Sequence, residues 1–137
     1  MTTFIDTNII LSILNEMEHL HDWAVDQLQI RRTLGPTIIC DIVYCETSIG
    51  MASLDDLNEA LTTLGITRIP ETDYSLFLAG RAFVNYKHIN KGPKNGVLPD
   101  FIIGALAYSL EVPLLTADVR RYKTYFPNLE LITPPMS

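Results

Sequence analysis

Residues 2–14 of this 137-residue chain read TTFIDTNIILSIL, and this segment carries the clearest signal of the fold class. Residues 2–5 are strand-like, and from Ile9 onward the apolar residues recur at a helical spacing. Asp6 stands at the junction between the two segments. A strand that leads directly into a helix is typical of α/β folds, in which ligands collect beyond the carboxyl ends of the strands. Asp6 is therefore a helix cap, a metal ligand or a nucleophile.

Short β-rich runs alternate with helical patterns along the rest of the chain. The alternation predicts an α/β fold with a central parallel sheet of about five strands flanked by helices, formed by residues 1–137 as a single domain whose residues 133–137 fray. Strands are expected at Thr3–Ile5, Thr37–Ile39, Thr67–Ile69, Pro113–Leu115 and Glu130–Ile132. Helices are expected from about Asn8 and at His19–Arg31, Asp41–Met51, Leu54–Leu64 with Ser53 as its cap, Asp73–Asn90 and Pro99–Leu110.

Charge and composition exclude several classes of protein. The formal net charge of −6 argues against a chain that coats nucleic acid or anionic membranes by bulk attraction, because those partners select basic surfaces. No apolar run approaches the roughly 20 residues that cross a bilayer, and no basic segment precedes the first apolar stretch. We therefore expect a cytoplasmic protein without a membrane partner. Cys40 and Cys45 match neither a redox motif nor a zinc-ligand spacing, so we expect two buried free thiols.

Two more acidic residues are expected at the same edge of the sheet as Asp6. Asp118 follows the predicted strand Pro113–Leu115, with Thr116 between them. Asp100 lies in the first turn of an apolar helix that follows a loop. Aspartate also caps helices and is favoured in their first turn by the helix dipole. Capping therefore explains each of these three acids when it is considered alone.

Glu46 is the acid that capping does not explain. In the segment CDIVYCETSIGM, Ile42, Glu46 and Ile49 fall at i, i+4 and i+7, which puts the carboxylate on the apolar stripe of a helix. A lone buried carboxylate is costly, so it requires a cationic partner. Arg81 or Lys87 could supply that partner through a salt bridge, and a metal ion shared with the other acids is the alternative.

The metal alternative joins four carboxylates in one site: Asp6, Glu46, Asp100 and Asp118. Carboxylates gathered in one pocket repel one another unless a cation holds them together. Ligands that are all oxygen atoms favour a hard cation, so this set predicts Mg²⁺, for which Mn²⁺ can substitute.

The chain resembles a PIN domain and, within that family, is most similar to the VapC-type toxins of toxin–antitoxin pairs. The resemblance spans nearly the whole chain and rests on FIDTNII, YCETSIG and LPDFIIGALAYSLEVPLLTADVRRY. It implies that the catalytic and metal-binding set is Asp6, Glu46, Asp100 and Asp118. It also implies that Asn8 and Thr116 orient this set. The fourth position varies within the family, so the resemblance leaves open whether Asp118 or Thr116 supplies the fourth ligand.

The resemblance implies a metal-dependent endoribonuclease, in which metal-activated water hydrolyses phosphodiester bonds of RNA. It also implies a homodimer that is held inactive by an antitoxin protein. Basic residues beside the predicted acids would neutralise the RNA backbone. These are Lys87, Lys91 and Lys94 before Asp100, and Arg120, Arg121 and Lys123 after Asp118. An ordinary solvated surface is the alternative explanation for both basic groups.

Two other functions are compatible with this sequence. A phosphatase of the haloacid dehalogenase type also has an Asp after its first strand, but its general acid is an Asp two residues later, where this chain has Asn8. A catalytically silent α/β module that binds a protein partner is the second alternative, although such a module has no need of four acids. His19, His21 and His88 have no evident catalytic partner, and we expect them to face solvent or an interface.

Overall fold

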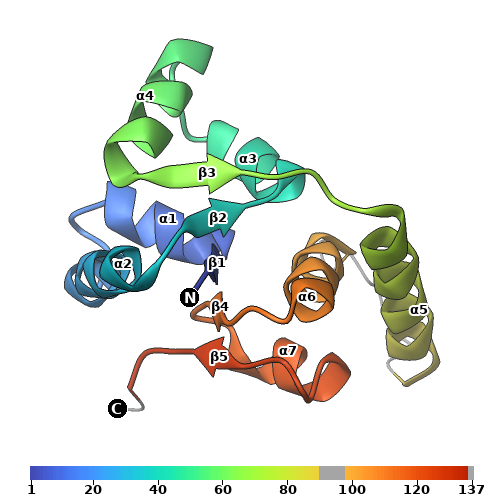
Figure 1. Ribbon diagram of the computed structural model, residues 1–137. Coiled ribbons are helices and arrows are strands. Elements are labelled where there is room, and N and C mark those ends of the chain that lie inside the picture. Colours follow the sequence, from blue (N-terminus) through green and yellow to red (C-terminus); the bar gives the residue numbers. More distant parts are fainter. Residues whose placement is uncertain (90–97, 136–137) are drawn as a thin grey trace.

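The computed structural model describes residues 1–89 and 98–135 (Figure 1). Within this part of the chain, parallel strands form one five-stranded sheet in the order β3-β2-β1-β4-β5. The strands are β1 (Thr3–Ile5), β2 (Thr37–Ile39), β3 (Ile66–Arg68), β4 (Leu114–Leu115) and β5 (Leu131–Ile132). The predicted α/β class with a central parallel sheet is confirmed, and every strand begins and ends within one residue of its expected bounds.

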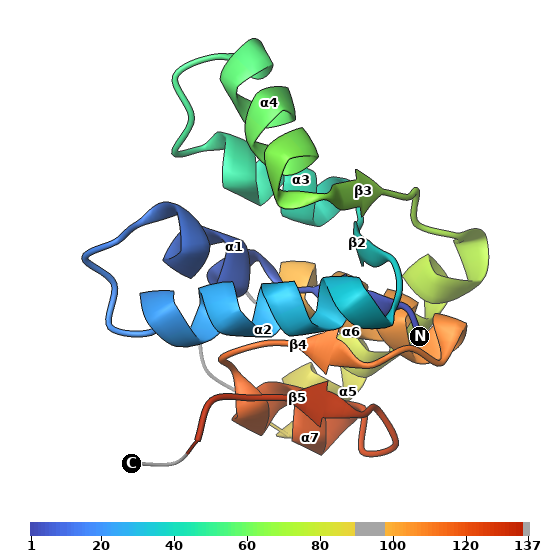
Figure 2. The same ribbon diagram turned by 60° about the vertical axis from the view of Figure 1, so that its left-hand side comes forward.

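The helices of the described residues flank this sheet. They are α1 (Thr7–Leu14), α2 (His21–Leu34), α3 (Asp41–Ser48), α4 (Leu54–Leu64), α5 (Asp73–Ile89), α6 (Leu98–Leu110) and α7 (Val119–Tyr125). α5 and α6 lie side by side, and α1 packs against both α2 and α3. α4 lies next to β3 at one edge of the sheet, and α7 lies near the other edge, next to α6 (Figures 1 and 2).

β1 lies at the centre of the sheet, between β2 and β4. Phe4 pairs with Ile38 of β2 and with Leu114 of β4, and Phe4 and Leu114 are fully buried. Both faces of a parallel sheet are covered by helices, which explains why β1, β2 and β4 are mostly apolar and are buried along their whole length. The N–H of Asp6 donates to the carbonyl of Leu115 at 3.0 Å. The residues that follow β1 and β4 therefore meet at the same edge, which we call the carboxyl edge.

Gly104 allows α6 and α7 to approach closely. A Cβ atom at this position would lie 2.8 Å from the ring of Phe126 and 3.0 Å from the ring of Tyr122. Such contacts are shorter than side-chain carbon atoms tolerate, and close-packed interiors cannot absorb them without movement. The glycine therefore helps to keep α7, and with it Tyr122, against the carboxyl edge.

The sequence predicted the helices with uneven accuracy. α4 is confirmed at both ends, where Ser53 Oγ accepts the N–H of Asp56 at 3.0 Å and Gly65, at φ 73°, follows the last helical residue. α2 begins at His21 instead of His19 and continues to Leu34. α3 ends at Ser48 instead of Met51, so the expected length of the helix that carries Glu46 was wrong.

α7 was not expected from the sequence. The structure forms a helix at Val119–Tyr125, immediately after Asp118. A signal for it exists, because Val119, Tyr122 and Phe126 fall at i, i+3 and i+7, and the two aromatic residues are buried. The pattern covers barely two turns and is interrupted by basic residues, and helices this short depend on tertiary packing more than on local sequence.

The prediction for the thiols was half wrong. Cys40 is buried, but Cys45 is exposed, because Val43 and Thr47 are the residues of α3 that are buried. His19 and His88 are exposed, as expected. His21 is instead half-buried, with Nδ1 at 2.9 Å from the carbonyl oxygen of Ser12.

No helix among the described residues has the length and apolar character needed to span a membrane. Of the expected frayed tail, residues 133–135 have no regular structure and residues 136 and 137 lie outside the described part of the chain.

Candidate functional site

Asp6 lies at the carboxyl end of β1, where only 3% of it is exposed. Its Oδ1 accepts the N–H of Thr7 at 2.8 Å, so the residue does cap α1. Capping accounts for only one of the two carboxylate oxygens. Oδ2 accepts the hydroxyls of Thr116 at 2.7 Å and Tyr122 at 3.0 Å, and the amide of Asn8 at 3.3 Å. Donors from three separate segments therefore fix the orientation of this carboxylate.

Asn8 and Thr116 tie the start of α1 to the segment after β4. The side-chain oxygen of Asn8 accepts the N–H of Ala117 at 3.1 Å, and Thr116 Oγ1 accepts the N–H of Asp118 at 3.0 Å. Thr116 is fully buried. The structure thus places both residues beside Asp6, where the resemblance had placed orienting neighbours.

Glu46 reaches the same edge from α3. Its side chain is half-buried, and Oε1 accepts the hydroxyl of Thr7 at 2.7 Å. Thr7 therefore connects the two acids, since its N–H binds Asp6 and its hydroxyl binds Glu46. The expected apolar stripe is wrong, because α3 ends before Ile49 and that side chain is 83% exposed.

The salt bridge considered as the alternative for Glu46 is not found within residues 1–89 and 98–135. The guanidinium of Arg81 lies 5.2 Å from the ring centre of Phe77, and the ammonium of Lys87 lies 5.8 Å from that of Phe83. Both cations therefore have other neighbours on α5. The structural salt-bridge explanation of Glu46 is not supported.

Asp100 and Asp118 share one basic partner. Asp100, in the first turn of α6, forms an ion pair with the Nη1 atom of Arg121. The same Nη1 atom lies 4.0 Å from Oδ2 of Asp118. Asp118 stands at the start of α7, but its side chain makes no capping hydrogen bond there. Capping therefore does not explain why this position is acidic.

The four acids influence one another electrostatically. Burial raises the pKa of Asp6, the hydrogen bonds from Thr116 and Tyr122 lower it, and the charge of Glu46 raises it further. The pKa of Asp100 is raised to about 6 by several causes together. Burial is the largest of them, the charges of Asp6, Asp118 and Glu46 also raise the pKa, and the charge of Arg121 lowers it. Excess negative charge is therefore concentrated at the carboxyl edge.

Tyr122 is a site residue that the sequence analysis missed. It is almost fully buried, and burial together with the charges of Asp6 and Asp100 raises its pKa. Its hydroxyl therefore stays protonated and donates to Asp6. The helical spacing of Val119, Tyr122 and Phe126 would have placed it on the inner face of a helix that begins at the carboxyl edge.

The donor set suits a hard divalent cation by its chemistry. All four acids supply carboxylate oxygens, and their mutual repulsion would be relieved by added positive charge. Among the residues that the structure describes, no three His, Cys, Asp or Glu side chains are already grouped as metal ligands.

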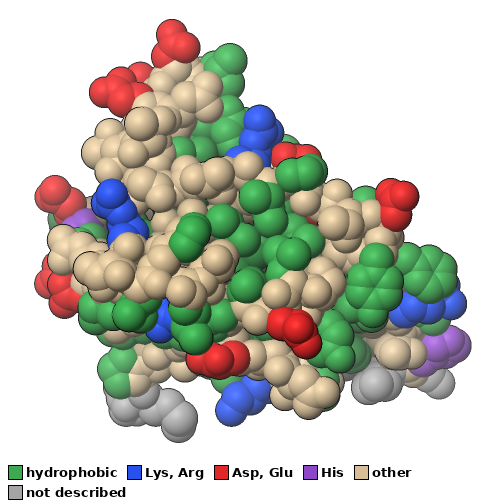
Figure 3. All heavy atoms as spheres, in the orientation of Figure 1, with side chains coloured by type: hydrophobic (Ala, Val, Ile, Leu, Met, Phe, Trp, Pro, Cys, Tyr) green, Lys and Arg blue, Asp and Glu red, His purple; other side chains and the backbone are tan. Residues whose placement is uncertain are grey.

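The predicted RNA-binding residues fall into three groups. Lys87 on α5 and Arg120 and Lys123 on α7 are exposed. Arg121 is instead bound to site acids. Lys91 and Lys94 lie outside the described residues. On the face shown in Figure 3, the coloured Lys and Arg side chains stand apart, and the hydrophobic side chains gather in the middle.

Comparison with family models shows that the chain belongs to the PIN domain family, which matches residues 3–127. A search of curated proteins found no match.

Solved structures with the same fold include complexes and toxins of VapBC systems. VapBC2 from Rickettsia felis, bound to a DNA fragment from its promoter, has a TM-score of 0.76 at 19% identity and covers 98% of this chain and 100% of that one. VapBC-1 from nontypeable Haemophilus influenzae has a TM-score of 0.68 at 18% identity, with coverage of 97% and 98%. VapC20 from Mycobacterium tuberculosis, described as a sarcin–ricin loop cleaving toxin, has a TM-score of 0.62 at 14% identity, with coverage of 89% and 94%.

Proposed function

We propose that this protein is a Mg²⁺-dependent endoribonuclease that hydrolyses phosphodiester bonds of RNA. One observation carries the proposal: the buried carboxylate of Asp6 is held by donors from three segments at an edge to which Glu46, Asp100 and Asp118 also contribute negative charge. The PIN family membership and the description of one structural neighbour as a sarcin–ricin loop cleaving toxin support the same substrate class.

In this proposal the metal ligands are Asp6, Glu46, Asp100 and Asp118. A bound Mg²⁺ ion would lower the pKa of a coordinated water and stabilise charge on the leaving oxygen. The protein itself supplies the orientation of the ligands. Thr116, Tyr122 and Asn8 fix one oxygen of Asp6, while the other oxygen, among the residues that the structure describes, accepts one hydrogen bond, from Thr7. That second oxygen therefore keeps capacity for a further partner.

The RNA backbone needs additional positive charge, since the net charge of the chain is −6. We assign this role to the exposed side chains of Lys87, Arg120 and Lys123, together with Lys91 and Lys94, which precede α6 in the sequence. These contacts would bind phosphate without reading the base sequence.

The protein is further proposed to be the toxin of a toxin–antitoxin pair. Several structural neighbours are VapBC complexes, two of which are bound to DNA. By analogy, residues 1–137 would act as a single cytoplasmic domain that forms a homodimer and is inhibited by an antitoxin protein. A short neighbouring gene for a DNA-binding protein with a disordered tail would support this role, and its product should co-purify with the chain.

A phosphatase of the haloacid dehalogenase type is less well supported. That chemistry requires a general acid at position 8, but the amide of Asn8 donates to Asp6 and its oxygen accepts from Ala117. Asn8 therefore has a positioning role in this structure. A silent interaction module remains the second alternative, and metal binding distinguishes it, because a silent module has no reason to bind Mn²⁺.

The test is cleavage of single-stranded RNA by the purified protein with Mg²⁺, Mn²⁺ or EDTA. We expect cleavage with either metal, loss of cleavage in EDTA, and recovery when Mn²⁺ is added in excess. The Asp6→Asn variant, purified in parallel, controls for contaminating ribonucleases. Cleavage that continues in excess EDTA would contradict the metal mechanism, and the absence of Mn²⁺ binding would favour the silent module.

A further inference from the structure

Arg121 occupies an unusual position for a residue expected to contact RNA. Its guanidinium is turned into the carboxyl edge, where Nη1 is paired with Oδ2 of Asp100 and lies 4.0 Å from Oδ2 of Asp118. In the part of the chain that the structure describes, both ion pairs made by the four site acids are made by this one side chain. Arg121 is therefore the principal positive charge inside the acid cluster.

The position of Arg121 is fixed by the next residue in the chain, Tyr122. Tyr122 is almost fully buried, and its hydroxyl is bonded to Asp6, so α7 cannot rotate freely about its axis. Asp118 and Arg121 are three residues apart on the same short segment, a spacing that brings side chains to one face. Arg121 therefore meets Asp100 of α6 as a consequence of the contact between Tyr122 and Asp6.

The ion pair is accessible enough to open. The side chain of Arg121 is 28% exposed, and those of Asp100 and Asp118 are 25% and 41% exposed. Charges at such a partly solvated edge can separate without the full desolvation penalty of a buried pair. A divalent ion bound to the carboxylate of Asp100 would repel the guanidinium that is paired with the same carboxylate, because both are cations.

We propose that Arg121 is an internal cation that competes with the divalent metal for Asp100 and Asp118, and that it leaves the acid cluster when the metal binds. This inference rests on the proposed function. In the metal-free protein, Arg121 neutralises part of the cluster. In the metal-bound protein, the released guanidinium is left at the entrance of the site, where a phosphate group of RNA would arrive. Arg121 is thus a positioning residue. It neutralises part of the acid cluster before the metal binds, and it lies at the entrance of the site afterwards.

Competition predicts a counterintuitive effect of removing this residue. Arg121→Gln deletes the competing cation, so Mn²⁺ affinity measured by isothermal titration calorimetry should increase about five- to tenfold, as expected when a competitor of modest pairing strength is lost. Arg121→Lys keeps the charge but loses the planar guanidinium, so the Mn²⁺ affinity of this variant should lie between those of the wild type and Arg121→Gln.

Arg120 supplies the matched control. It is the adjacent residue on α7, carries the same charge and is exposed. Arg120→Gln changes the net charge equally, so any general electrostatic effect on Mn²⁺ binding appears in this variant as well. We expect its Mn²⁺ affinity to stay within about twofold of the wild type at 0.15 M salt, where exposed charges are screened.

Thermal unfolding gives a second readout. In EDTA, Arg121→Gln leaves Asp100 and Asp118 without their cation, so its melting temperature should fall below that of Arg120→Gln. In excess Mn²⁺ the difference should shrink, because the metal replaces the lost charge.

The outcomes separate this inference from the proposed function. If wild-type protein does not bind Mn²⁺, the proposed function fails and this inference fails with it. If wild-type protein binds Mn²⁺ but Arg121→Gln binds it no more tightly than Arg120→Gln, only the competition is refuted. Tighter binding confined to the Arg121 variants, with a stability loss seen only in EDTA, would establish it.

Discussion

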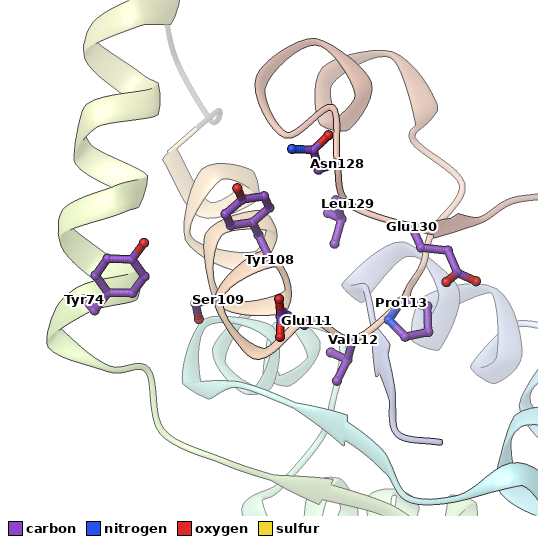
Figure 4. A pocket seen from close by; sticks show the side chains of 9 residues that line it. All are labelled: Tyr74, Tyr108, Ser109, Glu111, Val112, Pro113, Asn128, Leu129 and Glu130. Atoms are coloured by element: carbon purple, nitrogen blue, oxygen red, sulfur yellow. The ribbon is translucent and has the colours of Figure 1, made fainter.

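The two ends of the sheet both present carboxylates, but in different surroundings. Beyond the amino ends of β4 and β5, a recess of about 460 Å³ is bordered by Glu111 and Glu130 together with Tyr74 and Tyr108 (Figure 4). Both glutamates are exposed there. At the carboxyl edge, by contrast, Asp6 is buried and is bonded to residues far away in the chain.

The difference shows that the size of a recess does not identify the site. Exposed glutamates beside an open recess are solvated and can remain charged without a partner. The acids of the carboxyl edge come from four segments of the fold. The charge of Glu46 raises the pKa of Asp6, and the charges of Asp6, Asp118 and Glu46 raise the pKa of Asp100, in addition to the effect of burial. Such concentrated, partly buried charge is the feature associated with functional sites.

The largest expected effect is that of Asp6→Asn. The substitution removes an anionic ligand but keeps the shape of the side chain and an oxygen for the cap on α1. We expect RNA cleavage to fall at least about 100-fold, because ligand charge and orientation set both metal affinity and reactivity. Cleavage assays and Mn²⁺ titration on the folded variant measure this. RNA cleavage by Asp6→Asn at the wild-type rate would show that Asp6 acts only as the cap of α1.

A second prediction concerns the pH dependence of stability in EDTA. The pKa of Asp100 is raised to about 6 in the folded protein, above its ordinary value of 3.8. A raised pKa means that protonated Asp100 favours folding, so this contribution is fully present below about pH 4 and is lost as the pH rises through 6. Between pH 4 and 7, the wild type should lose about 2 kcal/mol relative to Asp100→Asn.

Chemical unfolding at several pH values measures this loss. Glu130→Gln, at the opposite end of the sheet, is the matched control and should follow the wild type across the same range. A parallel pH profile for the wild type and Asp100→Asn would show that the carboxyl edge holds no excess negative charge.

A smaller effect is expected for Glu46→Gln in EDTA. The amide oxygen can still accept the hydroxyl of Thr7, while one negative charge of the cluster is removed. We expect stabilisation of about 1 kcal/mol in the absence of metal, together with loss of most of the Mn²⁺-dependent gain. Differential scanning calorimetry with and without Mn²⁺ measures both. If the variant is less stable in EDTA but keeps its response to Mn²⁺, Glu46 is not part of the acid cluster that binds the metal.

The smallest effect is expected at the recess. Glu130→Gln should leave Mn²⁺ affinity and RNA cleavage within about twofold of the wild type, because the side chain is exposed and lies at the other end of the strands. Side-by-side titrations of this variant and Asp6→Asn give the contrast directly. A large loss of cleavage in Glu130→Gln would overturn the distinction between the two ends.

The sequence by itself determined the architecture. Apolar runs and helical spacing located all five strands of the described residues to within one residue, and a Ser cap and a terminal glycine bounded α4. These features are encoded by neighbouring residues, so they can be read locally. The order of strands and acids along the chain also indicated that Asp6, Thr116 and Asp118 gather at one edge, because parallel strands share their carboxyl ends.

Only the tertiary structure decided which side chains bind which. The hydroxyls that hold Asp6 come from residues 110 and 116 positions later, and the partner of Glu46 is Thr7 instead of a predicted basic residue. Arg121 likewise pairs with Asp100 across two helices, one of which was not predicted. Periodicity specifies which face of an element is buried, but it does not specify how two elements pack. Contacts between distant polar side chains depend on that packing and therefore appear only in the folded chain.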